Sequence, residues 1–180
     1  KAGYVDTGSW STKAMKEAKL FGDVIEIASS KEKNFNYIPK DYKISSDLDY
    51  AHITTNNTIY GTQFHKIPNS PCPLFSDMSS DIFSRNLNFN EFDLIYAGAQ
   101  KNIGPAGATL VIVKKEILES ICRKVPSMLN YKIHFDKDSM FNTPPVFSVY
   151  ACMLSLKWLE KKGGIEVVED LNRKKSEILY

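Results

Sequence analysis

Short apolar runs alternate with segments of helical period along most of this chain. The runs predict strands at Ala2–Val5, Asp23–Ala28, Tyr50–Thr54, Pro73–Phe75, Phe92–Ala97 and Thr109–Val113. The periodic segments predict helices at Trp10–Leu20, Lys114–Arg123, the stretch that follows Pro144-Pro145, and Ile165–Tyr180. Strands that are apolar throughout are typical of a mostly parallel sheet covered by helices on both faces. We therefore predict a three-layer α/β fold with a mostly parallel sheet flanked by helices.

Local signals suggest where the helices begin and end. Ser9 or Ser11 is expected to cap the first helix, and Gly22 to close it. The helix after Pro144-Pro145 carries an expected buried face of Val149, Cys152, Met153 and Leu156, and Gly163-Gly164 interrupts it. Residues 1–145 are interpreted as the major part of one large domain, and residues 146–180 as helices that lead toward a C-terminal small domain. The chain opens on Lys1 and closes within a helical pattern, so we expect it to be a piece of a longer protein.

Composition excludes several classes of function. The chain has 180 residues, 43% hydrophobic, and a net charge of +2, which is too close to neutral for a nucleic-acid or membrane-surface protein. No apolar stretch approaches the roughly 20 residues of a membrane span. The three cysteines, Cys72, Cys122 and Cys152, form no CxxC pair and no zinc-ligand spacing with the histidines. Free thiols in a reducing cytoplasm fit this pattern, and no metal site is expected.

Candidate chemistry lies where the strands end, because ligands of parallel α/β sheets bind at the carboxyl ends of the strands. Trp10, Thr58, Asp77 and Lys101 follow four of the apolar runs. Lys101 lies in the segment FDLIYAGAQKNIGPAGATLVIV (92–113), between two strand patterns, in a turn whose glycines allow close backbone approach to a ligand. The segment lacks the Gly-Lys-Ser/Thr spacing of a Walker phosphate loop. Taken alone, Lys101 would be interpreted as a loop lysine that points into solvent.

Asp77 ends the run CPLFSD, upstream of Lys101. A lysine amine and a carboxylate are the pair that pyridoxal phosphate (PLP) chemistry needs. The amine forms an imine with the aldehyde, and the carboxylate keeps the pyridine nitrogen protonated so that the ring accepts electrons. Judged from the residues alone, Asp77 could also be a helix cap or a loop acid.

At these residues the sequence resembles the phosphoserine aminotransferase family, in the class V branch of fold-type I PLP enzymes. The similar motifs are YAGAQKNIGPAG (96–107), VDTGSW (5–10), NNTIYG (56–61), SDMSSDIFSR (76–85), SMFNTPP (139–145) and KWLEKKGG (157–164). They occur in the family's order and cover essentially the whole chain. The lysine motif and FNTPP are the most specific of them. Asn57, Tyr60 and Met78 depart from the family's commonest pattern, in which an acid more often stands at the position of Asn57.

The resemblance implies roles for seven residues. Lys101 would form the Schiff base to PLP and carry the proton between the substrate Cα and the cofactor, and Asp77 would pair with the pyridinium nitrogen. The other implied cofactor contacts are Trp10 on the ring face, Thr58 at the ring hydroxyl, Gln100 at the phosphate, and Asn142 and Thr143 at the phosphate of a neighbouring subunit. The last two make a homodimer with a shared active site part of the expectation.

The implied reaction transfers the amino group of L-glutamate to 3-phosphohydroxypyruvate. The products are 2-oxoglutarate and O-phospho-L-serine, which places the enzyme in serine biosynthesis, with pyridoxine biosynthesis as a further role. The groups that bind the substrate phosphate and carboxylate are expected outside this chain. Three alternatives stay open: an alanine–glyoxylate type aminotransferase, a cysteine desulfurase, and a fragment that keeps the fold without catalysis. Desulfurases usually carry histidines where Gln100 and Trp10 stand here.

Overall fold

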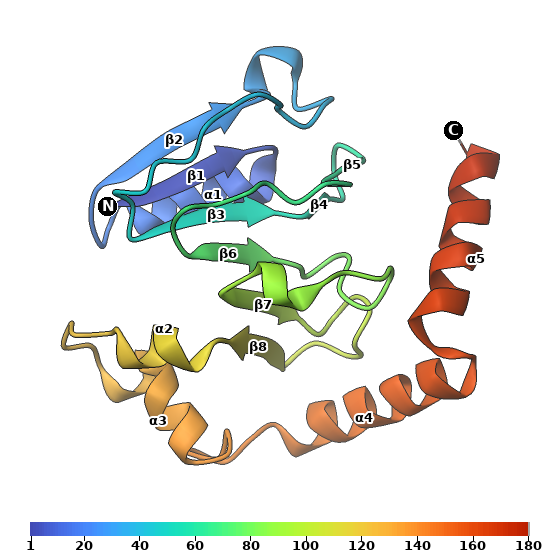
Figure 1. Cartoon of the computed structure of the whole chain (residues 1–180). Helices are drawn as coiled ribbons and strands as arrows, with labels where there is room; N and C mark the ends of the chain where they lie inside the picture. Colours follow the sequence, from blue (N-terminus) through green and yellow to red (C-terminus); the bar gives the residue numbers. More distant parts are fainter. Residues whose placement is uncertain (180) are drawn as a thin grey trace. The chain divides into compact units, whose positions relative to one another are not determined.

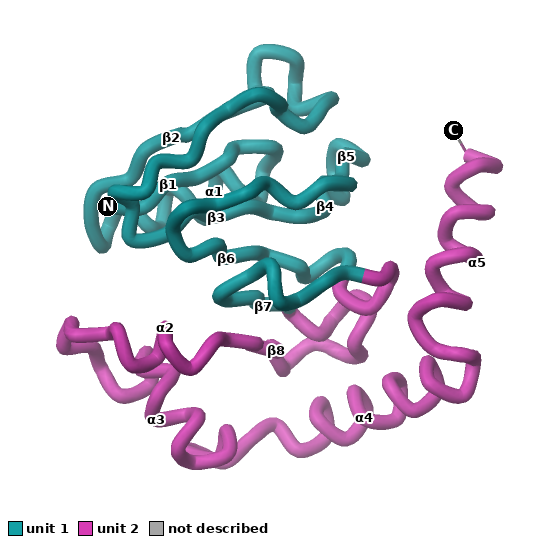
Figure 2. The backbone as a smooth tube through the Cα atoms, in the orientation of Figure 1, with its two compact units in different colours: residues 1–81, 87–97 teal, residues 82–86, 98–180 magenta. Residues whose placement is uncertain are grey.

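The computed structural model describes residues 1–179, which divide into two compact units. The first unit comprises residues 1–81 and 87–97, and the second comprises residues 82–86 and those that follow residue 97 (Figure 2).

The first unit is built on a parallel sheet (Figure 1). Its strands are β1 (Ala2–Asp6), β2 (Val24–Ser29), β3 (Tyr50–Thr54), β6 (Leu74–Asp77) and β7 (Leu94–Gly98). The strand order is β2-β1-β3-β6-β7, and each of the four pairings is parallel. The remaining elements are α1 (Ser9–Ala18), the 3₁₀ turns η1 (Lys31–Lys33) and η2 (Phe89–Glu91), and a small antiparallel hairpin of β4 (Asn56–Asn57) and β5 (Thr62–Gln63).

The apolar strands form the core because both of their faces are covered. All five residues of β1 are buried, and Val5, Ala51 and Ile53 have no exposed surface. Helix α1 packs on the face that carries Tyr4, with Met15 in the contact. Burial of this kind removes apolar side chains from water on two sides of the sheet. It stabilises the fold by about 25 cal/mol for each Å² of apolar surface that is buried. The continuous apolar runs therefore correctly indicated a parallel sheet.

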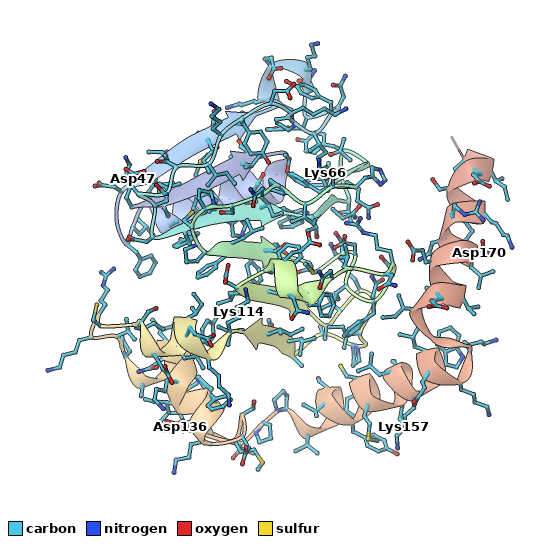
Figure 3. All side chains as sticks on the ribbon, viewed as in Figure 1. Asp47, Lys66, Lys114, Asp136, Lys157 and Asp170 are labelled. Carbon is cyan, nitrogen blue, oxygen red and sulfur yellow. The ribbon has the colours of Figure 1, made fainter. Side chains whose placement is uncertain are left out.

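The second unit holds one strand and most of the helices. Its elements are β8 (Thr109–Val113), α2 (Lys115–Glu119), η3 (Ser127–Leu129), α3 (Tyr131–Asp136), α4 (Val146–Lys161) and α5 (Gly164–Leu179). Charged residues such as Asp136 and Asp170, labelled in Figure 3, form ion pairs with lysine or arginine residues of their own helices. None of the helices in residues 1–179 is long and apolar enough to cross a membrane.

Two sequence-based expectations about helices are wrong. Gly8, and not Ser9 or Ser11, is the N-cap of α1, because the Ser11 hydroxyl turns back to accept hydrogen bonds from the amides of Thr7 and Gly8. The apolar face expected on α4 is largely exposed: Cys152 is its one buried residue within the described chain, whereas Val149 is 50% exposed.

Two helices also end earlier than expected. Helix α1 ends at Ala18 with Lys19 as its C-cap, so Gly22 does not close it. Helix α2 ends at Glu119, earlier than the expected Arg123. The strands Tyr50–Thr54 and Thr109–Val113 have the expected bounds, and the remaining strands shift by one or two residues. The domain boundary expected at residue 145 stays a prediction.

Candidate active site

The carboxyl ends of β3 and β6 place two polar side chains on one face of the sheet. Thr54 pairs with Asp77 in the parallel register, so both side chains point to the same side. One carboxylate oxygen of Asp77 accepts a hydrogen bond of 2.9 Å from the amide of Ser79. The Thr54 hydroxyl is buried and has no hydrogen-bond partner within residues 1–179. A buried hydroxyl that lacks a protein partner beside a half-buried carboxylate is typical of a place where a polar ligand binds.

The turn between β1 and α1 is held by a buried carboxylate. Asp6 is 1% exposed and accepts hydrogen bonds from the hydroxyls of Ser11, at 2.7 Å, and Thr12, at 2.8 Å. These bonds to a charged acceptor are stronger than neutral ones. They fix the first turn of the helix that carries Trp10. The Trp10 side chain is 43% exposed, and the Lys13 ammonium lies 4.8 Å from its ring centre.

Thr58 lies in the turn of the β4–β5 hairpin, where its side chain is exposed. The preceding residue, Asn57, is 1% exposed and contacts Thr7 on one side and Thr62 on the other. The Asn57 carbonyl also accepts a 2.8 Å hydrogen bond from the amide of Gly61, which closes the hairpin turn. The position of Thr58 in the fold is therefore set by buried neighbours.

His52 is a buried group that the sequence analysis did not single out. Its ring stacks on Tyr4, with centres 4.8 Å apart, and its Nε2 lies 3.0 Å from the hydroxyl of Tyr96. Burial lowers the pKa of His52 to about 4, against an opposing effect of the nearby Asp77 charge. His52 is therefore neutral at physiological pH. Its position two residues before Thr54 in β3 places it on the same face of the sheet as Asp77.

The second unit carries the remaining predicted site residues. Gln100 and Lys101 are exposed in the turn that follows Gly98. Two backbone hydrogen bonds define this turn, from the amide of Ala99 to the carbonyl of Ala108 at 3.0 Å and from the amide of Gly104 to the carbonyl of Ala99 at 2.8 Å. The turn therefore leaves both side chains accessible to a ligand.

Two glycines make this turn possible. Gly107 has a φ of 110°, in a region that favours glycine. A Cβ at Gly98 would lie 2.5 Å from the side-chain oxygen of Gln100, so the amide of Gln100 folds back over this glycine. These glycines of the lysine motif therefore allow the turn that the sequence predicted.

Asn142 and Thr143 are exposed just before α4 begins at Val146. Asp77, Trp10 and Thr58 belong to the first unit, whereas these two residues, Gln100 and Lys101 belong to the second. Within the first unit, hydrogen bonds join the segments that carry the predicted residues. The pairing of Asp77 with Lys101 stays a prediction.

Sequence reasoning missed Asp6, which ends the first strand, and His52, which lies inside a later one. A signal was available for Asp6. Asp6 is an acid at the end of a buried strand, and the hydroxyl residues Ser11 and Thr12 follow it in the first turns of the next segment. This combination indicates a buried capping network. Nothing in the sequence distinguishes His52 from an ordinary core residue.

A model of the class V aminotransferase family matches residues 4–180. The chain belongs to this family. The phosphoserine aminotransferases of Flavobacterium johnsoniae and Flavobacterium psychrophilum are 57% and 58% identical to it over 180 residues. Each match covers 100% of this chain and 51% of the relative, so the chain spans about half the length of these curated class V relatives.

Solved structures of class V enzymes confirm the α/β fold with a mostly parallel sheet flanked by helices. The phosphoserine aminotransferase of Bacillus circulans subsp. alkalophilus matches with a TM-score of 0.95 and 46% identity, over 99% of this chain and 50% of that one. The PLP-bound phosphoserine aminotransferase of Trichomonas vaginalis matches with a TM-score of 0.93 and 36% identity, over 100% of this chain and 55% of that one. An alanine–glyoxylate aminotransferase from Nostoc is 14% identical, with a TM-score of 0.72 over 99% of this chain and 52% of that one, which supports the fold alone.

Proposed function

We propose that this chain is part of a PLP-dependent transaminase that converts L-glutamate and 3-phosphohydroxypyruvate into 2-oxoglutarate and O-phospho-L-serine. The observation that carries the proposal is the exposed Lys101 in its glycine-rich turn, within a chain matched along its whole length by relatives named phosphoserine aminotransferase. A role in serine biosynthesis follows from the reaction, and a role in pyridoxine biosynthesis belongs to the same proposal. The cytoplasmic location expected from the cysteines stays a prediction.

The residues present fit PLP. The unpartnered Thr54 hydroxyl beside Asp77 is the kind of group that a polar aromatic ligand satisfies. Asp77 would hold a proton on the pyridine nitrogen, and Lys101 would bind the cofactor through its amine. Trp10 and Thr58 would contact the ring, and Gln100 its phosphate.

When bound, PLP supplies an electron sink for the negative charge that develops on the α-carbon of an amino acid. The chain's own groups move the proton. The amine of Lys101, once released, would take the proton from Cα of the substrate and return it on the cofactor side. The carboxylate of Asp77 would stabilise the positive charge of the ring nitrogen by about 4 kcal/mol for charges about 4 Å apart at an effective dielectric near 20.

A homodimer is part of the proposal, with Asn142 and Thr143 directed to the phosphate of the partner's cofactor. Support comes from the helix that follows them. Along α4, Phe147 is 78% exposed and Trp158 is 59% exposed. Exposed apolar side chains in such numbers are typical of an interaction surface.

The test uses the full-length protein, PLP and borohydride. The wild type is expected to develop an absorbance band near the edge of the visible range, and borohydride is expected to fix the mass of reduced PLP on the peptide that contains Lys101. Lys101→Ala abolishes both signals. Lys66→Ala, a change at an exposed lysine labelled in Figure 3, leaves them intact. Fixation of PLP by borohydride in Lys101→Ala at the wild-type level would refute the role of Lys101.

Substrate choice is tested separately. Glutamate with 3-phosphohydroxypyruvate is expected to give 2-oxoglutarate with a higher kcat/KM than alanine with glyoxylate. A preference for glyoxylate, or release of sulfide from cysteine, would assign the chain to one of the alternative class V reactions. Absence of any PLP band in the wild type would support the non-catalytic alternative.

A further inference from the structure

The first unit contains a buried hydrogen-bond network that joins the start of α1, which carries Trp10, to the β4–β5 hairpin, which carries Thr58. We define the turn–hairpin network as Asp6, Thr7, Ser11, Thr12, Asn57 and Thr62. Its centre is Asn57, which is 1% exposed. The side chains of this network lie between the start of α1 and the β4–β5 hairpin.

The carboxamide of Asn57 has polar contacts on two sides. Toward α1, its oxygen lies 3.3 Å and its nitrogen 3.2 Å from the hydroxyl of Thr7. Toward β5, its nitrogen donates to the hydroxyl of Thr62 at 3.2 Å and to the carbonyl of the same residue at 3.4 Å. An amide can donate and accept at the same time, whereas a carboxylate only accepts. Both the oxygen and the nitrogen of the Asn57 carboxamide therefore take part in these contacts.

The close contact at Gly8 shows how tightly the two segments fit. A Cβ on Gly8 would lie 2.9 Å from the carboxamide oxygen of Asn57 and 3.1 Å from the ring of Tyr60. The hydroxyls of Ser9 and Tyr60 lie 3.3 Å apart at the same junction. Any shift of the hairpin is therefore transmitted to the residues that precede Trp10.

The same stretch of chain is also bonded to the segment after β6. The amide of Thr55 donates to the carbonyl of Asp77 at 3.1 Å, and the hydroxyl of Thr55 donates to Asp81 at 2.6 Å. The side-chain amide of Asn56 donates to the hydroxyl of Ser80 at 3.0 Å, and that hydroxyl donates to the carbonyl of Asn56 at 2.8 Å. Residues 55–57 thus lie between the segment of Trp10 and the segment of Asp77.

We propose that Asn57 is a positioning residue, which sets Trp10 and Thr58 relative to each other by bonding the turn before α1 to the β4–β5 hairpin. The inference rests on the proposed function, because it concerns residues assigned to the cofactor ring. Asn57 itself is buried and acts through its neighbours. Loss of its bonds frees the hairpin turn that holds Thr58, so PLP binds a less ordered site.

The experiment compares three variants of the full-length protein. Asn57→Leu removes donor and acceptor at similar volume, and Asn57→Asp keeps the acceptor and removes the donor. Asn69→Asp, at an exposed asparagine of the same unit, is the matched control. Two readouts are used: the dissociation constant of PLP from its absorbance band, and the ¹⁹F resonance of 5-fluorotryptophan at position 10 in cofactor-free protein, assigned through Trp10→Phe.

Asn57→Leu is expected to weaken PLP binding about tenfold, the effect of losing roughly one net hydrogen bond. It also shifts or broadens the Trp10 resonance before any cofactor is added. Asn57→Asp gives a smaller change in the same direction, and Asn69→Asp matches the wild type. Should the variant not fold, its circular dichroism differs from the wild type, and the milder Asn57→Asp then decides by the same two readouts.

The outcomes separate this inference from the proposed function. Suppose that the wild type binds PLP and that the folded Asn57 variants bind it equally and leave the Trp10 resonance unmoved. This result overturns the positioning role and leaves the proposed function standing. A wild type without any PLP band overturns the proposed function, and the positioning role for the cofactor with it.

Discussion

Replacement of Asp6 by alanine tests whether the buried carboxylate organises the start of α1. In the wild type, Asp6 accepts from Ser11 at 2.7 Å and from Thr12 at 2.8 and 3.1 Å. Hydrogen bonds to a charged group contribute about 1.5–3 kcal/mol each. The two hydroxyls are not left without partners, because the carbonyl of Gly8 lies 2.8 Å from the first and 3.0 Å from the second. This alternative acceptor reduces the expected loss to about 2 kcal/mol in total.

Hydrogen exchange measures this loss locally. The amides of Thr7 and Gly8 donate to the Ser11 hydroxyl at 2.9 and 3.0 Å, so their protection depends on the position of that side chain. A local destabilisation of about 2 kcal/mol speeds exchange of these amides by about thirtyfold when opening is in rapid equilibrium. Asp6→Asn keeps one acceptor and gives an intermediate rate, and Asp23→Ala, at an exposed acid of the same unit, changes nothing. Wild-type exchange of both amides in a folded Asp6→Ala protein would show that the carboxylate is dispensable.

Two further predictions concern a buried histidine and a closely packed glycine. Because burial lowers the pKa of His52 from 6.5 to about 4, the unfolded chain binds a proton more readily than the folded one, so stability is present above pH 6.5 and is lost as pH falls toward 4. At pH 5 the free energy of unfolding is about 2 kcal/mol lower than at pH 7 because of His52. Urea unfolding at the two pH values measures this difference, and His52→Gln is expected to remove it. An undiminished pH dependence in His52→Gln contradicts the assignment. In the second unit, Gly104→Ala brings a Cβ to 2.8 Å from the sulfur and 3.0 Å from the Cα of Cys152, so we expect a loss of about 2 kcal/mol and a lower melting temperature. Gly22→Ala, where a Cβ meets nothing within 4 Å, is the control, and equal melting of the two variants would refute the packing argument.

The sequence predicted β1 and β3 well because nearly all of their residues are buried. Four of the five residues of Tyr50–Thr54 are buried, and only His52 among them departs from an apolar or small pattern. Helix α4 shows where such reasoning fails. Val149, Cys152, Met153 and Leu156 were expected to form one buried face, yet Val149 is 50% exposed and Met153 39%. The spacing of apolar residues predicts which side of a helix is apolar, but it does not predict which surface, if any, covers that side.

The site was predictable in part. Lys101 was singled out because it lies in a glycine-rich turn between two strand patterns, and Asp77 because it ends an apolar run upstream of that turn; the pairing of the two stays a prediction. Asn57 acts through buried hydrogen bonds to Thr7, 50 residues earlier in the chain, and no local pattern encodes such a contact. The Gly8 N-cap was missed for a related reason, since both candidate serines lie inside the helix and Ser11 serves the buried network.

The position of β1 in the sheet has a consequence for how the polypeptide folds as it is made. This strand lies between β2 and β3, and its register joins Ala2 to Val24 on one side and to Tyr50 on the other. A ribosome must therefore synthesise the whole of β3 before β1 can complete both of its ladders, and contacts this distant in sequence form slowly. Until then an apolar strand has an unpaired edge that chaperones or neighbouring nascent chains can bind. Slower translation once β3 has emerged from the ribosome would give this pairing time to form, and its effect is measurable as a higher yield of folded protein.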